Sequence, residues 1–327
     1  MFDPGFWTFV GLTAGIYAIF ALGLQVQYGL AGLLNFGHVA SMAIAAYTMA
    51  ILVVRFGLPE WLAAAAGIAA AVAAGLLIGL TSLRLRADYF AIVTICFSEI
   101  VRYVLLNRQD LTGGPEGTIA LLGRGQAAAY NGDWDSLAAA VRAAVSSATG
   151  VDLGRDVLML LLIWTVAAVL LLVVRRVSVM PWGRVLRSIR EDEEAASSVG
   201  KNVFARKLQA LALGAAIAGV AGVLYALEFS FFTPDDFEPL VTFFAWVVLI
   251  LGGAARVAGV PLGAVIFGLL FAGTRFFDFW PLSLLDSADR AYVRLIAIGL
   301  LLIGLMYYRP QGLLGRRQEM LLERAPP

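Results

Sequence analysis

The chain has 327 residues, of which 61% are hydrophobic and only 14% are charged, and its formal net charge is +1. A soluble domain carries about 25% charged residues, so a chain of this composition could not cover the surface of a soluble fold. A single histidine and a single cysteine exclude a Cys/His metal cluster and an intrachain disulfide, and the net charge gives no sign of a nucleic-acid partner.

Long apolar stretches predict the membrane spans. Most of them lack charged residues in their central turns, and each must be helical because the backbone finds no water to bond in hydrocarbon. They are residues 6–27, 37–54, 60–82, 88–106, 156–174, 207–228, 240–255, 258–276 and 291–308. At roughly 20 residues per span, the sequence predicts an all-α polytopic integral membrane protein with about 8–10 transmembrane helices in a single domain, residues 1–327.

The first predicted span leads into a stretch of unclear structure. Residues 1–4 lack the basic region of a cleaved signal peptide, so the first span is expected to be retained. Residues 28–37 are apolar, rich in glycine and too short to cross a bilayer alone; they could end one helix, begin the next or form a re-entrant half-helix. Asn35 and His38 flank Gly37 here and are candidates for a substrate pathway, although for His38 we favour a packed, hydrogen-bonded role.

The span at residues 88–106 contains further pathway candidates. Glu99 is the one carboxylate well inside a predicted span, and an ionised carboxylate in lipid costs several kcal/mol, so we expect it to face the bundle interior. It lies either on a pathway or in an ion pair with Arg102, and the sequence favours neither. Thr94 and Ser98 are also candidates, although helical hydroxyls commonly bond their own backbone.

Charge distribution predicts the orientation in the membrane. The loop at residues 175–207 and the carboxyl-terminal tail at residues 309–327 are rich in arginine, so the positive-inside rule makes both cytoplasmic. The segment 107–155 is then external, and it carries the acidic residues Asp110, Glu116, Asp133, Asp135 and Asp152. The amino terminus lies outside if residues 28–54 cross once, and inside if they cross an even number of times or re-enter.

Within the cytoplasmic loop, residues 181–200 predict one short amphipathic helix. Pro181 suits the first helical position, where its missing N–H group is lost at no cost. Apolar residues recur at helical spacing, and Gly200 is placed to end the helix.

The charges of this helix favour a protein partner. Arg187 and Arg190 precede Glu191 and Glu194 by four residues, which is within reach of ion pairs. Basic amphipathic helices often lie on anionic lipid, but four consecutive acidic residues at 191–194 would be repelled there. We therefore favour docking on a protein over lying on the membrane surface.

The docking segment is similar to the coupling loop of ABC-importer permeases, a Glu-Ala-Ala-type loop followed by glycine. Other landmarks occur in an order that resembles the permeases of branched-chain amino acid importers, specifically the LivM-like branch. They are Asn35–His38 (NFGH), 83–94 (LRLRADYFAIVT), Glu99–Ile100, 111–117 (LTGGPEG), 230–237 (SFFTPDDF), 248–253 (VLILGG) and 309–315 (RPQGLLG). Each motif alone is weak, but the ordered set covers residues 35 to 315 and is specific.

The resemblance implies a type II ABC importer permease in a bacterial plasma (inner) membrane. Such a chain forms half of a pathway with a LivH-like permease, docks two cytoplasmic ATPase subunits on the 181–200 segment, and receives substrate from an external binding protein. The implied coupling residues are Arg187, Glu191, Glu194, Ala195 and Gly200. The chain has no Gly-rich loop with Lys and Ser/Thr, so ATP and Mg would act in the ATPase subunits, and we expect no cofactor here.

The substrate and two other function classes stay open. Permeases of this family handle branched-chain and other amino acids, amides, urea and aromatic acids. A secondary transporter or channel would carry charges deep in several spans, whereas only Glu99 is so placed. A membrane enzyme would need clustered ligands or a nucleophile with its base. We therefore expect a transport subunit that is not itself an enzyme.

Overall fold

The structure is a computed structural model that describes residues 4–124, 131–149, 154–229, 231–254, 256–276, 287–309 and 311–314. Every regular element within these ranges is a helix, as the sequence predicts. Asp152 and the part of the predicted tail beyond residue 314 lie outside the described residues.

Helices occupy each of the predicted spans. In the described part of the chain, six are long and apolar enough to cross a membrane. They are α1 (Pro4–Leu24) with its continuation η1 (Gln25–Leu30), α2 (Val39–Phe56), α3 (Glu60–Ser82), α4 (Ala87–Asn107), α8 (Arg155–Val179) and α11 (Val203–Glu228). The last three predicted spans are α12 (Pro239–Gly252), α13 (Gly259–Phe276) and α14 (Ser287–Tyr308). The 14 residues of α12 reach only about 21 Å, less than the thickness of the hydrocarbon core.

Short helices fill the connections. They are α5 (Gln109–Thr112), η2 (Gly114–Glu116), α6 (Thr118–Arg124), α7 (Gly132–Thr149), α9 (Pro181–Glu191), α10 (Glu193–Ser198) and η3 (Pro234–Phe237). The single helix predicted for residues 181–200 is therefore two helices. Asp192 between them is extended, with φ −153° and ψ 107°, and its carboxylate accepts a hydrogen bond from the backbone N–H of Ala195, which caps α10. Gly200, with φ +77°, follows α10 at the predicted end.

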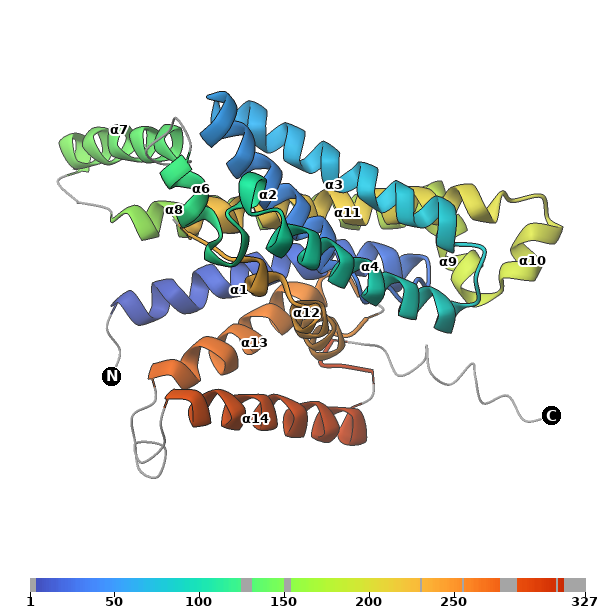
Figure 1. Cartoon of the computed structure of the whole chain (residues 1–327). Helices are drawn as coiled ribbons and strands as arrows, with labels where there is room; N and C mark the ends of the chain where they lie inside the picture. Colours follow the sequence, from blue (N-terminus) through green and yellow to red (C-terminus); the bar gives the residue numbers. More distant parts are fainter. Residues whose placement is uncertain are drawn as a thin grey trace.

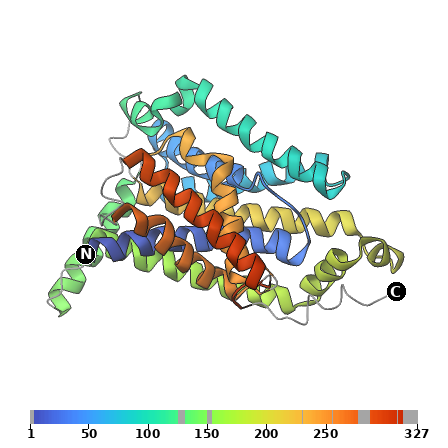
Figure 2. The same cartoon turned by 90° about the horizontal axis from the view of Figure 1, so that it is seen from below.

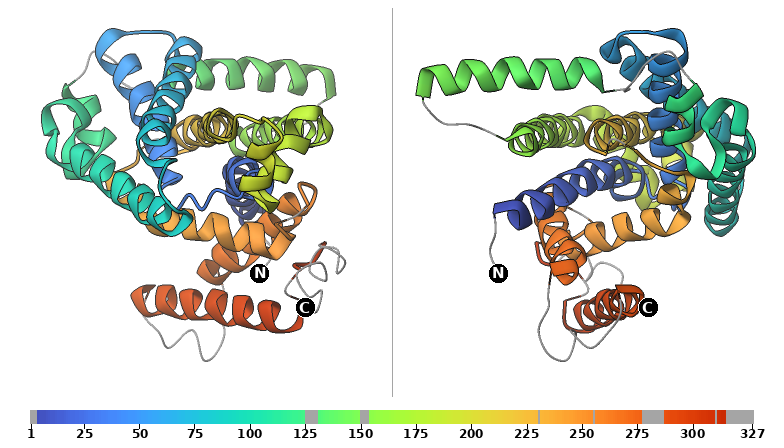
Figure 3. Two further views of the ribbon diagram at one scale, coloured as in Figure 1. Left: turned by 90° about the vertical axis from the view of Figure 1, so that its right-hand side faces the viewer. Right: turned by 60° about the vertical axis from the view of Figure 1, so that its left-hand side comes forward.

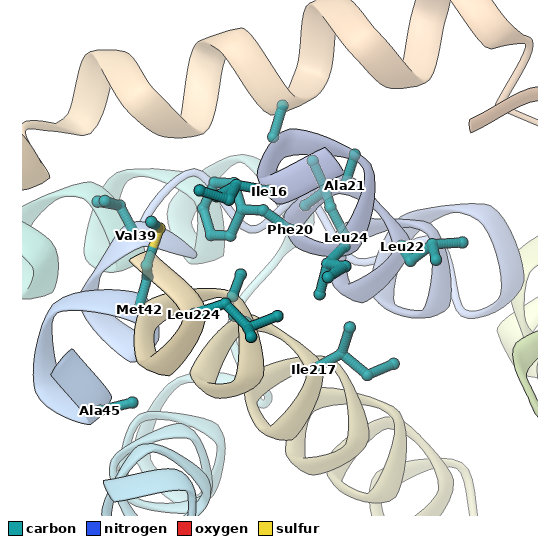
Figure 4. Close-up of a cluster of buried hydrophobic side chains, with 14 of the residues drawn as sticks. Ile16, Phe20, Ala21, Leu22, Leu24, Val39, Met42, Ala45, Ile217 and Leu224 are labelled. Atoms are coloured by element: carbon teal, nitrogen blue, oxygen red, sulfur yellow. The ribbon is translucent and has the colours of Figure 1, made fainter. Parts of the chain in front are cut away.

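The centre of the bundle consists of α1, α2 and α11. Of the most apolar 18 residues of each span, 78% are buried in α1 with η1 and 67% in α2 and in α11, against 22% in α8. Figure 4 shows Phe20, Met42 and Leu224 in this core, one from each central helix. The outer helices expose long apolar side chains such as Leu77 and Leu172, as expected for contact with lipid. Helix α14 lies at the periphery (Figure 2).

Small residues let the central helices pack backbone against backbone. Burial of apolar area gives little driving force between helices in lipid, so close approach has to supply the attraction. A Cβ atom at Gly222 of α11 would overlap the carbonyl oxygen of Met42 in α2. A Cβ atom at Gly75 of α3 would lie 2.7 Å from the Cβ atom of Ala215 in α11. Small residues therefore let α11 approach both α2 and α3 closely.

The bundle has two distinct ends, one with α7 and the other with α9 and α10 (Figure 1). Glu60, which follows α2, binds the start of α7. Arg190 of α9 donates a hydrogen bond to the carbonyl oxygen of Gly29 in η1. Helix α1 therefore runs from the α7 end to the α9–α10 end, and α2 returns. Residues 28–54 cross once, which puts the amino-terminal end of α1 at the α7 end.

The carboxyl-terminal motif closes the short helix α12. Gly312 has φ +77°, and it packs against Gly253, which follows α12 and has φ +100°. The backbone N–H groups of Leu313 and Leu314 then donate to the carbonyl oxygens of Leu251 (3.0 Å) and Gly252 (3.3 Å). A helix end leaves such carbonyl groups without partners inside the helix, so residues 311–314 determine where α12 ends.

Helix α7 is held to α3 by reciprocal capping, although it projects from the bundle (Figure 3). The Glu60 carboxylate accepts hydrogen bonds from the backbone N–H groups of Asp133 (2.6 Å) and Trp134 (2.9 Å). The Asp133 carboxylate in turn accepts a hydrogen bond from the backbone N–H of Glu60 (3.0 Å). Each acidic side chain thus satisfies the free N–H groups at the start of the other helix.

We expect Glu60→Ala to release α7 while the bundle stays folded, because loss of a helix cap costs about 0.5–2 kcal/mol locally. Hydrogen exchange should accelerate in residues 132–149 and stay unchanged in α11. Glu116→Ala, at an exposed site on η2, is the control. Unchanged protection of residues 132–149 in Glu60→Ala would contradict the capping role.

Candidate functional site

A non-helical stretch crosses the buried centre of the bundle from residue 31 to residue 38. Helix α1 ends in the π-helical turn η1, and α2 begins at Val39. Of the three arrangements that the sequence left open for residues 28–37, residues 28–30 end the first helix as part of η1, while the rest form a loop between two spanning helices and not a re-entrant half-helix. π-turns are rare in proteins overall, but those that occur are often found at functional sites. Since no water reaches backbone groups in hydrocarbon, the loop needs partners from the protein.

Two amides supply part of this need. The Nδ2 atom of Asn35 donates a hydrogen bond to Oε1 of Gln27 (2.9 Å), and Oδ1 of Asn35 accepts one from the N–H of Gly37 (2.9 Å). Gln27 Nε2 donates to the carbonyl oxygen of Leu211 on α11 (3.2 Å). Asn35 and Gln27 are both buried. The loop is thereby connected to the end of α1 and to α11.

Two hydroxyl groups from other helices complete the network. Thr94 Oγ1 on α4 accepts a hydrogen bond from the N–H of Phe36 (3.1 Å). Thr242 Oγ1 on α12 accepts one from the N–H of Val39 at the start of α2 (3.0 Å). A Cβ atom at Gly37 would overlap the carbonyl oxygen of Thr94, so this position has no room for a side chain. The break thus fixes α4 and α12 against α1 and α2.

A small cavity lies where these polar groups converge. Its volume of about 10 Å³ corresponds to roughly one water molecule. It is bounded by residues of η1, the loop and four spanning helices: Gln27, Asn35, Gly37, Ser41, Gly75, Ile78, Thr94, Phe97, Leu211 and Ala215. Of the predicted pathway residues, the structure brings Asn35 and Thr94 together here. In this conformation the cavity is too small for an amino acid.

His38 lies away from the cavity. Its ring stacks on Phe20 at a centroid distance of 4.8 Å, and Nε2 lies 3.3 Å from the carbonyl oxygen of Phe20. The side chain is completely buried between α1 and α2. This is the packed, hydrogen-bonded arrangement that the sequence favours for a lone histidine.

Ser98 and Glu99 do not join Asn35 and Thr94. Ser98 is buried and donates a hydrogen bond to the carbonyl oxygen of Ile95 in its own helix (2.8 Å). Glu99 forms an ion pair with Arg102 (2.9 Å), and Arg102 also binds Asp235 on η3 (2.8 Å). The geometry of Glu99 is therefore that of an ion pair which links α4 to η3.

The sequence analysis missed three polar residues of the site: Gln27, Ser41 and Thr242. The signal for Gln27 was present, because an amide in the last turn of an apolar span needs a buried partner. For Thr242 no signal existed, since one hydroxyl in an apolar helix normally bonds its own backbone. Its partner, Val39, is 203 residues away in the chain.

Helices α9 and α10 present the predicted coupling residues unequally. Glu191, Glu194, Ala195 and Gly200 are exposed. Arg187 instead turns toward the bundle, where its Nη2 atom donates a hydrogen bond to the carbonyl oxygen of Ser178 (3.0 Å). Four of the five residues are therefore exposed, and the fifth holds α9 against the end of α8.

Neither predicted ion pair is present among the described residues. The break at Asp192 separates Arg190 from Glu194, whereas Arg187, in the same helix as Glu191, turns to the Ser178 carbonyl oxygen instead. Arg190 lies 3.8 Å from Glu191, and Glu193 forms an ion pair with Lys207 of α11. The strong contact of Arg190 is its hydrogen bond of 2.6 Å to the Gly29 carbonyl oxygen in η1. Less than one turn of η1 thus separates the Gly29 contact of α9 from Gln27 and the cavity.

Comparison with known proteins identifies the family. Residues 8–306 match the family described as branched-chain amino acid transport system / permease component. The chain is 37% identical to the high-affinity branched-chain amino acid transport system permease protein LivM of Escherichia coli, over 94% of this chain and 69% of that protein. It is 24% identical to a probable LivM of Methanocaldococcus jannaschii, over 92% of this chain and 90% of that protein.

A similarity to a second type of permease is also present. The chain is 27% identical to LivH of Escherichia coli, over 94% of each chain. No solved structure matches this chain significantly. The family match over most of the chain and the 37% identity show that this chain belongs to the permease components of branched-chain amino acid transport systems.

Proposed function

We propose that this chain is the LivM-like permease subunit of an ABC importer that moves branched-chain or other amino acids inward. It forms the pathway with a LivH-like permease, and ATP hydrolysis on two partner ATPase subunits drives transport. The observation that carries this proposal is the exposed acidic face of α9 and α10, which is connected through Arg190 to η1 beside the buried polar cavity. Membership of the family and its LivM and LivH relatives support the pairing.

The charges at the two ends of the bundle support a cytoplasmic position for the α9–α10 end. The α9–α10 end carries Arg175, Arg176, Arg184 and Lys201, which the positive-inside rule assigns to the cytoplasm. The opposite end carries α7 and the acidic residues of the segment 107–155. In this orientation the amino terminus is external, the ATPases dock on α9 and α10, and the external binding protein docks at the α7 end.

The contacts of α9 give a route for motion from the ATPase face to the pathway. A partner that pulls on Glu191 or Glu194 moves α9, and α9 is bonded through Arg190 to the carbonyl oxygen of Gly29. Gly29 lies two residues beyond Gln27, whose amide holds Asn35. A π-turn is less stable than an α-turn, so η1 is suited to switch between two hydrogen-bond patterns. Such a switch would open the cavity at Asn35 and Thr94.

The amides and hydroxyls at the cavity suit an uncharged or zwitterionic substrate. The alternative is that this chain is a permease of the same family for urea, amides or aromatic acids, transported by the same mechanism. An importer fails to transport when its ATPase subunits are removed, whereas a secondary transporter or channel does not. Uptake by membranes that contain this chain without ATPase subunits would therefore overturn the proposal.

Glu191→Lys combined with Gly200→Ala tests the coupling face. Both residues are exposed, so the bundle should fold normally, and Ala at a φ of +77° is strained. We expect uptake to fall by at least about tenfold while basal ATP hydrolysis by the partner subunits continues, since like charges across an interface cost several kcal/mol. Arg184→Gln, also exposed on α9, is the control. Unchanged uptake and unchanged stimulation of hydrolysis would exclude this face.

Thr94→Val tests the network of the buried loop. The substitution keeps the side-chain shape but leaves the N–H of Phe36 without its partner, which costs about 1–3 kcal/mol. We expect a lower Tm and reduced uptake of labelled leucine. Thr81→Val is a matched control, because Thr81 is exposed and bonds only its own helix. Equal Tm and uptake in both variants would argue against the network.

Glu99→Gln tests whether Glu99 acts in an ion pair or as a residue of the substrate pathway. A partly exposed ion pair is worth ~0–1 kcal/mol, so uptake should stay within about twofold of the unsubstituted protein. The measurement is initial uptake at matched amounts of protein in the membrane. A loss of uptake at an unchanged Tm would contradict this expectation and assign Glu99 to the substrate pathway.

A further inference from the structure

A basic cavity at the α9–α10 end has no role in the function proposed above. Its volume is about 380 Å³, within the range of small-molecule sites. Four parts of the chain that are distant in sequence form it: the end of η1, the last turn of α8, helix α9 and the turn between α12 and α13. The lining residues are Leu30, Arg175, Ser178, Arg187, Arg256, Val257 and Ala258.

Three arginine side chains line this cavity. Among the residues that the structure describes, no carboxylate lies within 4 Å of Arg175, Arg187 or Arg256. Glu191, the nearest acidic residue in sequence on α9, is close to Arg190 instead. Like charges brought together repel one another, and the repulsion is relieved when an anion binds between them.

The cavity is a built feature of the corner between α8 and α9. A Cβ atom at Gly183 would lie 2.5 Å from the carbonyl oxygens of Val177 and Ser178, so the glycine allows a tight turn. The turn brings Arg187 under the end of α8, where the Ser178 carbonyl oxygen orients its guanidinium. Guanidinium has five N–H donors, and the other donors of Arg187 stay available for a ligand.

The depth and the walls of the cavity point to a phospholipid headgroup. Arginine binds phosphate in a planar, two-pronged geometry that suits several guanidinium groups around one anion. Leu30, Val257 and Ala258 give the cavity an apolar wall, and they lie at helix ends, where hydrocarbon meets the polar layer. Basic pockets between transmembrane helices at this level bind anionic phospholipids.

A docked ATPase subunit is a poorer candidate for the anion. The exposed face of α9 and α10 is acidic at Glu191, Asp192, Glu193 and Glu194, so a complementary partner surface is basic. An ATPase subunit whose basic surface binds the acidic residues of α9 and α10 would therefore not bring carboxylates to the three arginines of the cavity.

We propose that Arg175, Arg187 and Arg256 bind the phosphate of an anionic phospholipid headgroup at the α9–α10 end of the bundle. The bound lipid then neutralises the cavity and braces the corner from which α9 projects.

The test uses the full chain, purified in detergent with its co-purifying subunits and stripped of lipid. Phosphatidylglycerol, phosphatidylcholine or inorganic phosphate is added, and the Tm is followed by tryptophan fluorescence, since a ligand of the native state raises the Tm. Of these three ligands, we expect only phosphatidylglycerol to raise the Tm. Arg175→Gln and Arg256→Gln should each weaken its apparent affinity by about fivefold, the contribution of one arginine near an anionic surface.

Arg176→Gln is the matched control, because Arg176 is the exposed neighbour of Arg175 on α8 and does not line the cavity. Arg175→Lys and Arg256→Lys should retain most of the affinity, which separates loss of charge from loss of folding. An equal response of Arg175→Gln, Arg256→Gln and Arg176→Gln to phosphatidylglycerol would overturn the proposal. So would a full response to inorganic phosphate, which would assign the cavity to a free anion, or an equal response to phosphatidylcholine.

Discussion

The structure depends on how the backbone of residues 31–38 obtains hydrogen bonds in a region without water. A helix satisfies its own backbone, but a loop at membrane depth cannot. Here the side chains of Asn35 and Thr94 accept hydrogen bonds from N–H groups of the loop, and Thr242 accepts one from the N–H of Val39, where α2 begins. They come from the loop itself, from α4 and from α12, so the loop can form only when these helices are packed around it. The break in the helical ladder therefore sets the relative positions of the spans.

In the proposed mechanism, the loop at residues 31–38 and the adjoining η1 connect the polar cavity with helix α9. On one side, Gln27 and Asn35 line a cavity that holds about one water molecule. On the other side, the π-turn accepts a hydrogen bond from Arg190 of α9. A coupled transporter needs an element with two arrangements that both sites can bias, and we propose η1, between α1 and the loop at residues 31–38, for this role.

The arginines of α9 show how position changes the role of one residue type. Arg184 is exposed beside the acidic face, whereas Arg190 braces η1 and Arg187 lines the basic cavity. Arg187 and Arg190 attach α9 to the bundle through their hydrogen bonds to the carbonyl oxygens of Ser178 and Gly29. The exposed carboxylates of Glu191 and Glu194 stay available to a partner. Helical periodicity alone predicts similar solvent exposure for all three arginines, because the long side chain of each can extend past its neighbours on the helix.

The sequence by itself determined the helical membrane fold, the order of the spans and the helical character of the segment at residues 181–200. Run length and low charge are properties of each segment alone, and hydrocarbon permits only helices for such runs. It also predicted the ends of that segment at Pro181 and Gly200, since proline and glycine act on local backbone geometry.

The tertiary structure alone decided the form of residues 28–37, the break at Asp192 and the grouping of Asn35 and Thr94 apart from His38 and Glu99. These features depend on partners such as Thr242, which lies 203 residues from the N–H group it binds. Contacts between distant segments follow from packing in three dimensions, and no local pattern of residue types records them.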